Sequence, residues 1–589
     1  MHLGYSTSKY RGNLYKTYYI ARSVRKNNTV RKDILWTLGK LTDDEAMKIK
    51  MICETMTDSN EVLTMLSDIV VKETKPYGEL FIANLLWDEW KFSKIFSRFG
   101  TNSLLTTEIV TQILTINRCT SPCSHYAIPD WIKRTAISEI TGHNLEKVDE
   151  NKIYYELDKI ASNQDYFEDH LFNMTFHKNK DSYRNINYDL STSYFYGMKC
   201  DLSNYGVSKD GKSDHKQVML GVMVNDLGYP FKWDVYPGNT SEIETLEGNI
   251  NACCKRFKLK NVNIVFDRGI ASDDNLQYID KNGLKYITAL DKDQIPNVPG
   301  INLDIFEGTT GENYEHILTK HGFKKYAADL WYYELGHVDT QRYILGFNPI
   351  LKVGEQECRN EKMAVFEKFL VGKNEELRQA KRKRKQNPTR DCIISELKRL
   401  KIKKYYHEPV LEPINIMVQT KKGLTRKVSS FKVHIDKKYD IAQRSNRLDG
   451  LCVFVTNHIE NKENEYNFSP EDVIRAYREK TKIEDAFKHI KSFVKIRPFF
   501  VHTESHVRAV YTICMLSYFL NKDLAERRKR IENSDFLNSK QLYEPFEKYY
   551  FSTIIDKRNA KMKREPMKFT AEDSSYIAKM GFKRTMAQM

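Results

Sequence analysis

The order of expected strands and helices between residues 185 and 290 limits the fold more than any other feature of this 589-residue chain. Three runs rich in β-branched and aromatic residues, INYDLSTSYF, KQVMLGVMVN and FKWDVYPG, follow one another across turns, which predicts three successive strands. A helix, the buried strand VNIVFD, a short helix and the strand LKYITAL are expected next. Strands that alternate with helices in this way predict an α/β domain.

The order β-β-β-α-β-α-β resembles that of a ribonuclease-H-like core, and the rest of the chain divides around it. Residues 14–38 alternate polar and apolar positions around Asn27 and Asn28, which predicts a β-hairpin, and Thr42 with Glu45 forms a capping box for a following helix. The predicted parts are residues 1–70, a basic hairpin-and-helix module; 71–180, a helical region that suits DNA binding or a plain helical bundle; 181–290, the first part of the core; 291–466, a mixed β-rich insertion; 467–525, the second part of the core; and 526–589, a basic C-terminal region.

The balance of charges favours a polyanion as partner. Lys and Arg total 94 against 78 Asp and Glu, which gives a formal net charge of +16 and a pI near 9.0. An AT-rich gene, which encodes much Lys, Asn, Ile and Tyr, is the alternative explanation. Ten scattered cysteines suit free thiols in a reducing cytoplasm, and neither the N-terminus nor the run YTICMLSYFL suits a signal peptide or a membrane span. A soluble cytoplasmic protein without membrane contact is expected.

One long helix is predicted to begin at Ser469, in the run SPEDVIRAYREKTKIEDAFKHIKSF. Ser469 suits the N-cap, Pro470 suits the first helical position, and Asp472 completes a capping box. At about 100° per residue, a polar stripe lies beside the apolar face of this helix. The stripe consists of Tyr477, Lys480, Glu484 and Lys491.

An ionised glutamate beside a buried face needs a cation close to it. Lys480, one turn before Glu484, and Lys488, one turn after it, could each supply an ordinary i,i+4 ion pair. Taken alone, the helix favours this structural interpretation over a functional one.

Asp189 and Asp267 change that balance. Asp189 lies inside the first expected core strand, and Asp267 ends the strand VNIVFD, at a strand end of the kind where ligands gather in α/β sheets. These two strands are neighbours in a ribonuclease-H-like sheet, so their carboxylates are expected to converge, with Glu484 completing the cluster. Three carboxylates in one place suit Mg²⁺ or Mn²⁺. Two such ions, about 4 Å apart, can activate a water or a 3′-hydroxyl and stabilise the leaving oxygen in phosphodiester cleavage.

The same residues resemble a known family at several points. The run Tyr477, Lys480, Glu484 and Lys491 has the spacing of the Tyr-x2-Arg-x3-Glu-x6-Lys signature of bacterial insertion-sequence DDE transposases. YDLSTSYF, FDRG and the long run from GVSKDG to SEIETL resemble the acidic regions of that family. The similarity covers about residues 185–290 and 469–520, and more weakly the N-terminal hairpin that ends in LGKL.

This resemblance implies a DNA transposase that cuts and joins element ends at a two-metal site holding Mg²⁺ or Mn²⁺. Asp189, Asp267 and Glu484 would be the catalytic metal ligands. Tyr477, Lys480 and Lys491 would contact the DNA backbone, and Arg268 would lie near DNA. The implied partners are double-stranded DNA, as terminal inverted repeats and as target, and a second copy of the chain in a homodimer. Such a protein is expected in the prokaryotic cytoplasm, and on the nucleoid when it is bound to DNA.

Lys480 departs from the signature, which has arginine at this position. A lysine keeps the positive charge but lacks the bidentate fork that grips phosphate, and it can pair with Glu484 instead. Two other functions therefore stay open: a nuclease of the same fold without strand transfer, and a non-catalytic DNA-binding protein derived from a transposase.

Two other motifs, a group of Cys and His residues and a run of basic residues, could bind a metal ion or phosphate. Cys119, Cys123 and His125 have no second ligand pair at zinc-finger spacing, so a structural loop is the favoured interpretation. The KRKRK run at residues 381–385 suits a nuclear signal, a phosphate-binding patch or a solvated helix face.

Overall fold

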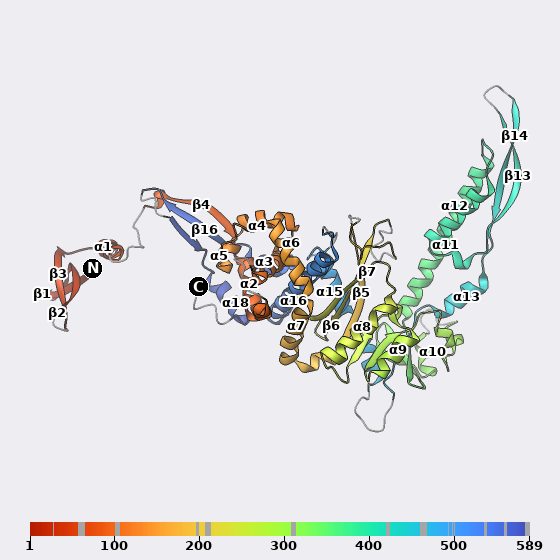
Figure 1. Cartoon of the computed structure of the whole chain (residues 1–589), viewed down its shortest axis with the longest axis horizontal. Coiled ribbons are helices and arrows are strands. Elements are labelled where there is room, and N and C mark those ends of the chain that lie inside the picture. The colour runs from red at the N-terminus through yellow and green to blue at the C-terminus, as the bar shows by residue number, and fades with distance from the viewer. Residues whose placement is uncertain are drawn as a thin grey trace. The chain divides into compact units, whose positions relative to one another are not determined.

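The computed structural model shows the chain as two compact units (Figure 1). It describes residues 1–589 without 27–28, 57–64, 100–105, 196–198, 207–213, 308–313, 420–423, 460–467, 493, 497–498, 500, 535–538, 559–561 and 583–589. The first unit comprises Met1–Leu85, Pro129–Lys147 and Tyr543–Met589, and the second comprises Leu86–Ile128 and Val148–Leu542. Each unit therefore combines distant parts of the sequence.

The N-terminal part of the first unit is an antiparallel sheet. Its strands are β1 (His2–Tyr10), β2 (Asn13–Lys26) and β3 (Thr29–Gly39), in that order. Strands β2 and β3 confirm the predicted hairpin, whose turn at residues 27–28 lies outside the described residues. The pattern of the sequence does not predict β1. Thr42 and Glu45 form the predicted capping box at the start of α1 (Asp43–Thr55).

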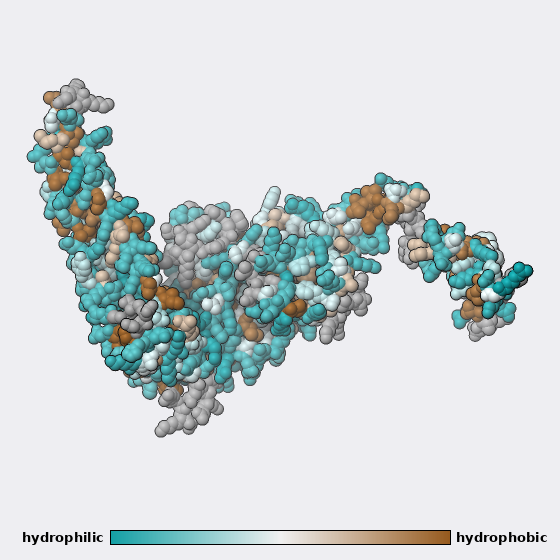
Figure 2. Space-filling model, turned by 180° about the vertical axis from the view of Figure 1, so that it is seen from behind, coloured by the Kyte–Doolittle hydropathy of each residue, from teal (hydrophilic) through white to brown (hydrophobic). Residues whose placement is uncertain are grey.

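A second sheet in the first unit joins residues from opposite ends of the chain. Strand β4 (Ile69–Pro76) pairs with β16 (Tyr550–Asp556), which pairs with β17 (Met562–Pro566). The same unit contains α5 (Ile137–Thr141) and α18 (Ala571–Lys579), while α2 (Gly78–Glu89), α4 (Ile128–Arg134) and α17 (Ser539–Tyr543) include residues at its sequence boundaries. Exposed apolar side chains such as Leu66 and Val71 lie by this sheet, where Figure 2 shows a brown patch.

The second unit is built on a large mixed sheet. Among the described residues the strand order is β10-β11-β12-β15-β9-β8-β5-β6-β7. The core strands and helices are β5 (Asn185–Tyr194), β6 (Gln217–Val224), β7 (Pro230–Pro237), α8 (Leu246–Asn251), β8 (Asn263–Phe266), α9 (Asp273–Lys281) and β9 (Lys285–Ala289). Strand β8 runs parallel to both β5 and β9, and β5, β6 and β7 are antiparallel. The predicted order of elements between residues 185 and 290 is confirmed.

Strands from the predicted insertion continue this sheet beyond β9. They are β10 (Lys324–Ala327), β11 (Leu330–Val338), β12 (Gln341–Phe347) and β15 (Leu451–Thr456), and α10 (Tyr314–Lys320) precedes them. Strand β15 pairs with β9 on one side and with β12 on the other. Residues 291–466 therefore contribute directly to the central sheet.

The described residues between Pro349 and Leu448 form an arm that extends from the sheet (Figure 1). The arm contains α11 (Pro349–Arg378), α12 (Gln386–Arg399), the hairpin strands β13 (Val410–Gln419) and β14 (Thr425–His434), and α13 (Tyr439–Leu448). A separate apolar core that includes Phe366, Leu377, Ile393 and Val433 holds these elements together. Residues 381–385 form a non-helical connection between α11 and α12, so the helix-face interpretation of KRKRK is wrong.

Helices pack on the central sheet. Helix α16 (Glu504–Glu532) packs on β7 and on α3 (Thr107–Thr120), α6 (Glu150–Ser162) and α7 (Gln164–Lys178). Helices α14 (Pro470–Arg478) and α15 (Thr481–Ser492) cover strands in the middle of the sheet. Among the described helices, none combines the length and apolar composition that a membrane crossing requires.

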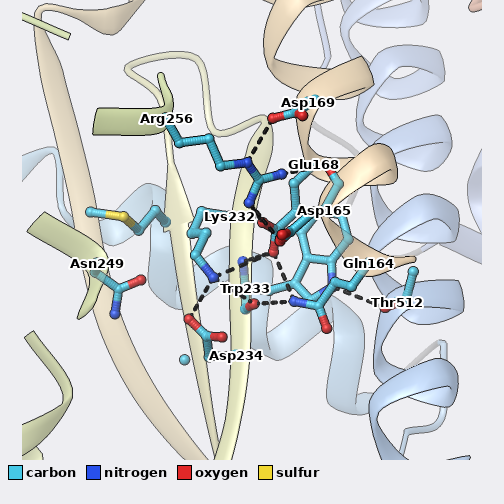
Figure 3. Close-up of polar contacts among 12 residues, drawn as sticks. Gln164, Asp165, Glu168, Asp169, Lys232, Trp233, Asp234, Asn249, Arg256 and Thr512 are labelled. Carbon is cyan, nitrogen blue, oxygen red and sulfur yellow. Dashed lines mark hydrogen bonds and ion pairs between the residues drawn. The ribbon is translucent and has the colours of Figure 1, made fainter. Parts of the chain in front are cut away.

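A buried ion-pair network joins α7 to β7 (Figure 3). The fully buried carboxylate of Glu168 accepts hydrogen bonds from the Trp233 backbone N–H at 3.1 Å and from Arg256 at 2.6 Å. Lys232 Nζ lies 3.5 Å from Glu168 and 2.7 Å from Asp234. Burial alone would lower the pKa of Lys232, but Glu168 and Asp234 raise it to about 12. The lysine therefore stays charged, because the carboxylates of Glu168 and Asp234 stabilise its ammonium.

Acidification should destabilise the helices around His125, which is buried with its ring 6.0 Å from that of Tyr154. Burial, and then the charges of Arg118 and His506, lower the pKa of His125 to about 3. An unfolded histidine has a pKa of about 6.5, so the unfolded chain binds the proton more readily between these values. The stability contributed by neutral His125 is complete above about pH 6.5 and falls as the pH decreases, by about 2 kcal/mol at about pH 5.

Urea denaturation at about pH 7.5 and about pH 5 measures this loss. His125→Phe should lose about 2 kcal/mol less than the wild-type chain between the two pH values. Equal losses in both proteins would contradict the assignment of the effect to His125.

Candidate active site

Asp189 and Asp267 lie next to each other at the junction of two parallel strands. Tyr188 of β5 is paired with Phe266, the last residue of β8. Asp189 and Asp267 are the residues that follow this pair. The expected convergence of the two carboxylate-bearing positions at one edge of parallel strands therefore agrees with the register.

Both aspartates belong to the same face of the sheet. On β5, Tyr188 and Leu190 point into the large apolar core on one face, so Asp189 between them points to the other face. On β8, Phe266 belongs to that same core, whereas Val265 packs with residues of α14. Asp267 shares the side of Val265, and α14 and α15 cover this side.

The single helix predicted from Ser469 is wrong, because the chain forms two helices with a turn at Glu479 and Lys480. The predicted start is confirmed: Ser469 and Asp472 form the capping box and Pro470 follows. Helix α14 buries Val473, Ile474 and Ala476 with residues of β8, β9 and β15. Helix α15 instead packs on β5, β6 and α16. The turn lets both apolar faces reach their own strands.

This turn brings Lys480 between two carboxylates. The Lys480 ammonium lies 3.2 Å from Asp267 Oδ2 and 3.8 Å from Glu484 Oε1, and the residue is only 8% exposed. The Tyr477 hydroxyl donates to Asp267 Oδ1 at 3.3 Å, and the backbone N–H of Arg268 donates to the same oxygen at 2.9 Å. Two of the four stripe residues, Tyr477 and Lys480, thus contact Asp267, and a third, Glu484, contacts Lys480.

These contacts set the charge state of the site. Burial alone would raise the pKa of Asp267, but Lys480 and the N–H and charge of Arg268 hold that pKa below its ordinary value. Asp267 is therefore ionised at neutral pH. Burial, and then the neighbouring charge of Asp267, raise the pKa of Tyr477, so its hydroxyl stays a hydrogen-bond donor.

The other predicted site residues lie around this centre. The Glu484 side chain is 58% exposed, and half-buried Asp189 accepts a hydrogen bond from the Leu190 N–H at 2.8 Å. Arg268 forms an ion pair with Asp291 at 3.2 Å, and Lys491 lies in the last turn of α15. Within the part of the chain that is described, no three His, Cys, Asp or Glu side chains are already grouped as ligands of one metal ion.

An open cavity adjoins Asp267 and contains residues that the sequence interpretation missed. Besides Asp267, Arg268 and Tyr477, its lining includes Lys292, Asn348 and Arg478. Lys292 follows strand β9 closely and Asn348 follows β12, so a search for polar residues just after each buried strand would have found both. Arg478 is held by an ion pair with Asp329 at 2.6 Å.

Two family models match parts of the chain. Residues 174–520 match the family described as "Transposase DDE domain", and residues 3–64 match "IS1634 family transposase, N-terminal domain". The sequence has no significant match among curated proteins.

Two solved structures show a distant likeness. A piggyBac transposase synaptic complex with hairpin DNA has 9% identity and a TM-score of 0.33 over 81% of this chain and 82% of that chain. The Mos1 transposase paired-end complex with left transposon end has 10% identity and a TM-score of 0.14 over 36% of this chain and 77% of that chain. The family match, which spans more than half of the sequence, shows that the chain belongs to the transposase DDE domain family.

Proposed function

We propose that this protein is a DNA transposase that binds the ends of an insertion element, cuts them and joins them to target DNA. Its catalytic centre would be Asp189, Asp267 and Glu484 on a ribonuclease-H-like core. One observation carries the proposal: the Lys480 ammonium is held between Asp267 and Glu484, beside the strand junction that bears Asp189. Because these carboxylates already hold the positive charge of an ammonium, they form an environment that also suits metal cations.

The residues present fit divalent metal ions. Asp189, Asp267 and Glu484 offer only carboxylate oxygens, which are the ligands that Mg²⁺ and Mn²⁺ prefer. The ammonium of Lys480 already places one positive charge between two of these carboxylates, Asp267 and Glu484. When bound, a pair of such ions would activate the attacking hydroxyl or water and stabilise the leaving oxygen of the phosphodiester.

Neighbouring side chains would hold DNA in this proposal. Tyr477 keeps its proton, so it could donate a hydrogen bond to a phosphate oxygen, and Lys491 in the last turn of α15 and Arg268 beside Asp267 would supply positive charge. Lys480 would exchange its carboxylate partners for a phosphate. In this proposal two copies of the chain act together on two element ends.

A supercoiled plasmid that carries the terminal inverted repeats of the element tests this function. Incubation with the protein and Mg²⁺ should produce cuts at the ends of the element. Cleavage without joining to a target would instead indicate a nuclease, and binding without cleavage would indicate a DNA-binding protein.

Lys480→Met should tighten the binding of Mn²⁺ by roughly one order of magnitude, because the ion no longer competes with an ammonium for Asp267 and Glu484. The concentration of free Mn²⁺, followed by electron paramagnetic resonance without DNA, measures this change independently of activity. The matched control is Lys482→Met, since Lys482 pairs with Glu479 at 2.7 Å and not with the candidate ligands. Unchanged or weaker Mn²⁺ binding in Lys480→Met would contradict the proposed ligand set.

Lys480→Arg should preserve or raise the rate of end cleavage. Arginine keeps the charge and adds the fork that grips phosphate bidentately. Initial cleavage rates on the same plasmid compare this variant with wild type. A strong loss would show that the lysine has a role that arginine cannot perform.

A further inference from the structure

We propose that the outer end of the arm binds the phosphate backbone of double-stranded DNA, as a second contact surface away from the candidate active site. The surface, here called the arm loop, consists of residues 379–385 between α11 and α12 and the adjoining part of β14. The inference rests on the proposed function only in requiring that the chain acts on DNA.

The charge of the arm loop is concentrated and of one sign. Residues 378–390 and 413–432 contain seven and five Lys or Arg residues and no Asp or Glu. Lys381, Arg382, Lys383 and Lys385 are exposed, and none of these four forms an ion pair within the described residues. Cations without counter-charges on a surface attract a polyanion and release its counterions on binding.

Other basic side chains of the arm, including Arg384 of the arm loop, pair with acidic ones. Glu376 pairs with Lys373 and Arg384, at 2.7 and 3.0 Å, and Glu396 pairs with Arg399 at 2.6 Å. The four exposed cations of the arm loop thus stand out from a background in which charges of opposite sign meet.

The arm loop is held in a defined conformation before any partner binds. The Arg384 N–H donates to the Ser429 carbonyl of β14 at 3.0 Å, and Arg426 donates to the Lys381 carbonyl at 2.7 Å. The Ser430 hydroxyl donates to the Leu377 carbonyl at 2.6 Å. A surface fixed in this way loses little backbone entropy when it binds a ligand.

The arm begins at the cavity that adjoins Asp267. Asn348 caps α11 and lines that cavity together with Leu351. Another cavity at the base of the arm shares Lys292 and Leu351 with it and adds a group of lysines. The lysines of this group are Lys362, Lys401 and Lys404. Helix α11 has 30 residues, so it spans about 45 Å, the length of about 13 base pairs.

This arrangement fits duplex DNA better than a single strand. Single-stranded nucleic acids are held largely by stacking of bases on aromatic side chains. Residues 378–390 contain no Phe, Tyr or Trp, and the one aromatic residue among residues 413–432, Phe431, packs against the apolar core of the arm. A stiff, regular row of phosphates can reach from the cavity to the arm loop, and lysines at the base of the arm lie between the two.

The test replaces Lys381, Arg382, Lys383 and Lys385 together by glutamine in the full-length protein. A matched control replaces Lys255, Lys260, Lys281 and Lys320, which are also exposed, and removes the same charge. Fluorescence anisotropy with a duplex of about 30 base pairs, without terminal repeats and without metal, gives Kd over a range of salt concentrations. The arm variant should bind about tenfold more weakly. The slope of log Kd against the logarithm of salt concentration should also decrease, by an amount that corresponds to up to about three lost phosphate contacts. The control should change Kd by less than about threefold.

The outcomes separate this inference from the proposed function. Equal weakening in both variants would mean that net charge alone matters, and an arm variant that binds like wild type would also overturn the inference while leaving the proposed function intact. Failure of the wild-type chain to bind this duplex would overturn the inference, whereas the proposed function is overturned only by failure to bind and cut the plasmid with terminal inverted repeats. Lengthening the duplex from about 10 to about 30 base pairs should strengthen wild-type binding more than binding by the arm variant, because only the longer duplex reaches both surfaces.

Discussion

Replacing Asp267 by asparagine is expected to reduce end cleavage at least about a thousandfold while the protein stays folded. The substitution keeps the shape of the side chain but removes the negative charge that faces Lys480 at 3.2 Å. The charge is present at neutral pH in the wild-type chain, because Lys480 and Arg268 hold the pKa of Asp267 below its ordinary value despite burial. Without it the proposed site would lose a carboxylate ligand for divalent ions.

The matched control is Asp293→Asn, the same chemical change at an exposed position near the base of the arm. Initial rates of nicking on the inverted-repeat plasmid, with equal amounts of folded protein, compare the two variants. Asp293→Asn should cleave like wild type. Asp189→Asn and Glu484→Gln should behave like Asp267→Asn, and normal cleavage by Asp267→Asn would refute the proposed site.

The second large effect is on stability. Glu168→Ala should lower the free energy of unfolding of the part that contains the central sheet by about 3–5 kcal/mol. The change leaves Arg256 and Lys232 without their buried anion and leaves the Trp233 N–H without its acceptor. The midpoint of urea denaturation, followed by circular dichroism, measures the loss.

Glu247→Ala is the control for this stability change, because Glu247 is exposed in α8 and outside the network. It should shift the midpoint by less than about 0.5 kcal/mol. Adding Lys232→Met to Glu168→Ala should recover part of the loss, since it removes a buried charge that has lost one of its two carboxylate partners. A double variant no more stable than the single one would argue against electrostatic coupling of the pair.

The sequence correctly predicted the features that depend on residues close to one another in the chain. The capping box at Ser469 and Asp472 marked the start of α14, and the order of strands predicted that Asp189 and Asp267 would be neighbours. The turn at Lys480 was missed because both halves of the run have helical apolar periodicity, and only the strands that each half covers require the turn.

The sequence pattern did not predict contacts between segments that lie far apart in the chain. Lys480 has Glu484 four residues away, so the pattern suggested that pair, whereas Asp267 lies closer in space. The pairing of β4 with β16 joins segments from near the two ends of the chain. The KRKRK run has a composition that suits a helix surface, but its place between α11 and α12 depends on the packing of both helices with β14.

Cleavage and joining in one reaction test the central claim most directly. A donor plasmid with both inverted repeats and a separate target plasmid would be incubated with the protein, with and without Mg²⁺, and the products would be sequenced. The account predicts that element ends are cut and joined to the target only when Mg²⁺ is present, and that Asp267→Asn abolishes both steps. Products that form without a divalent ion, or that Asp267→Asn forms at the wild-type rate, would contradict it.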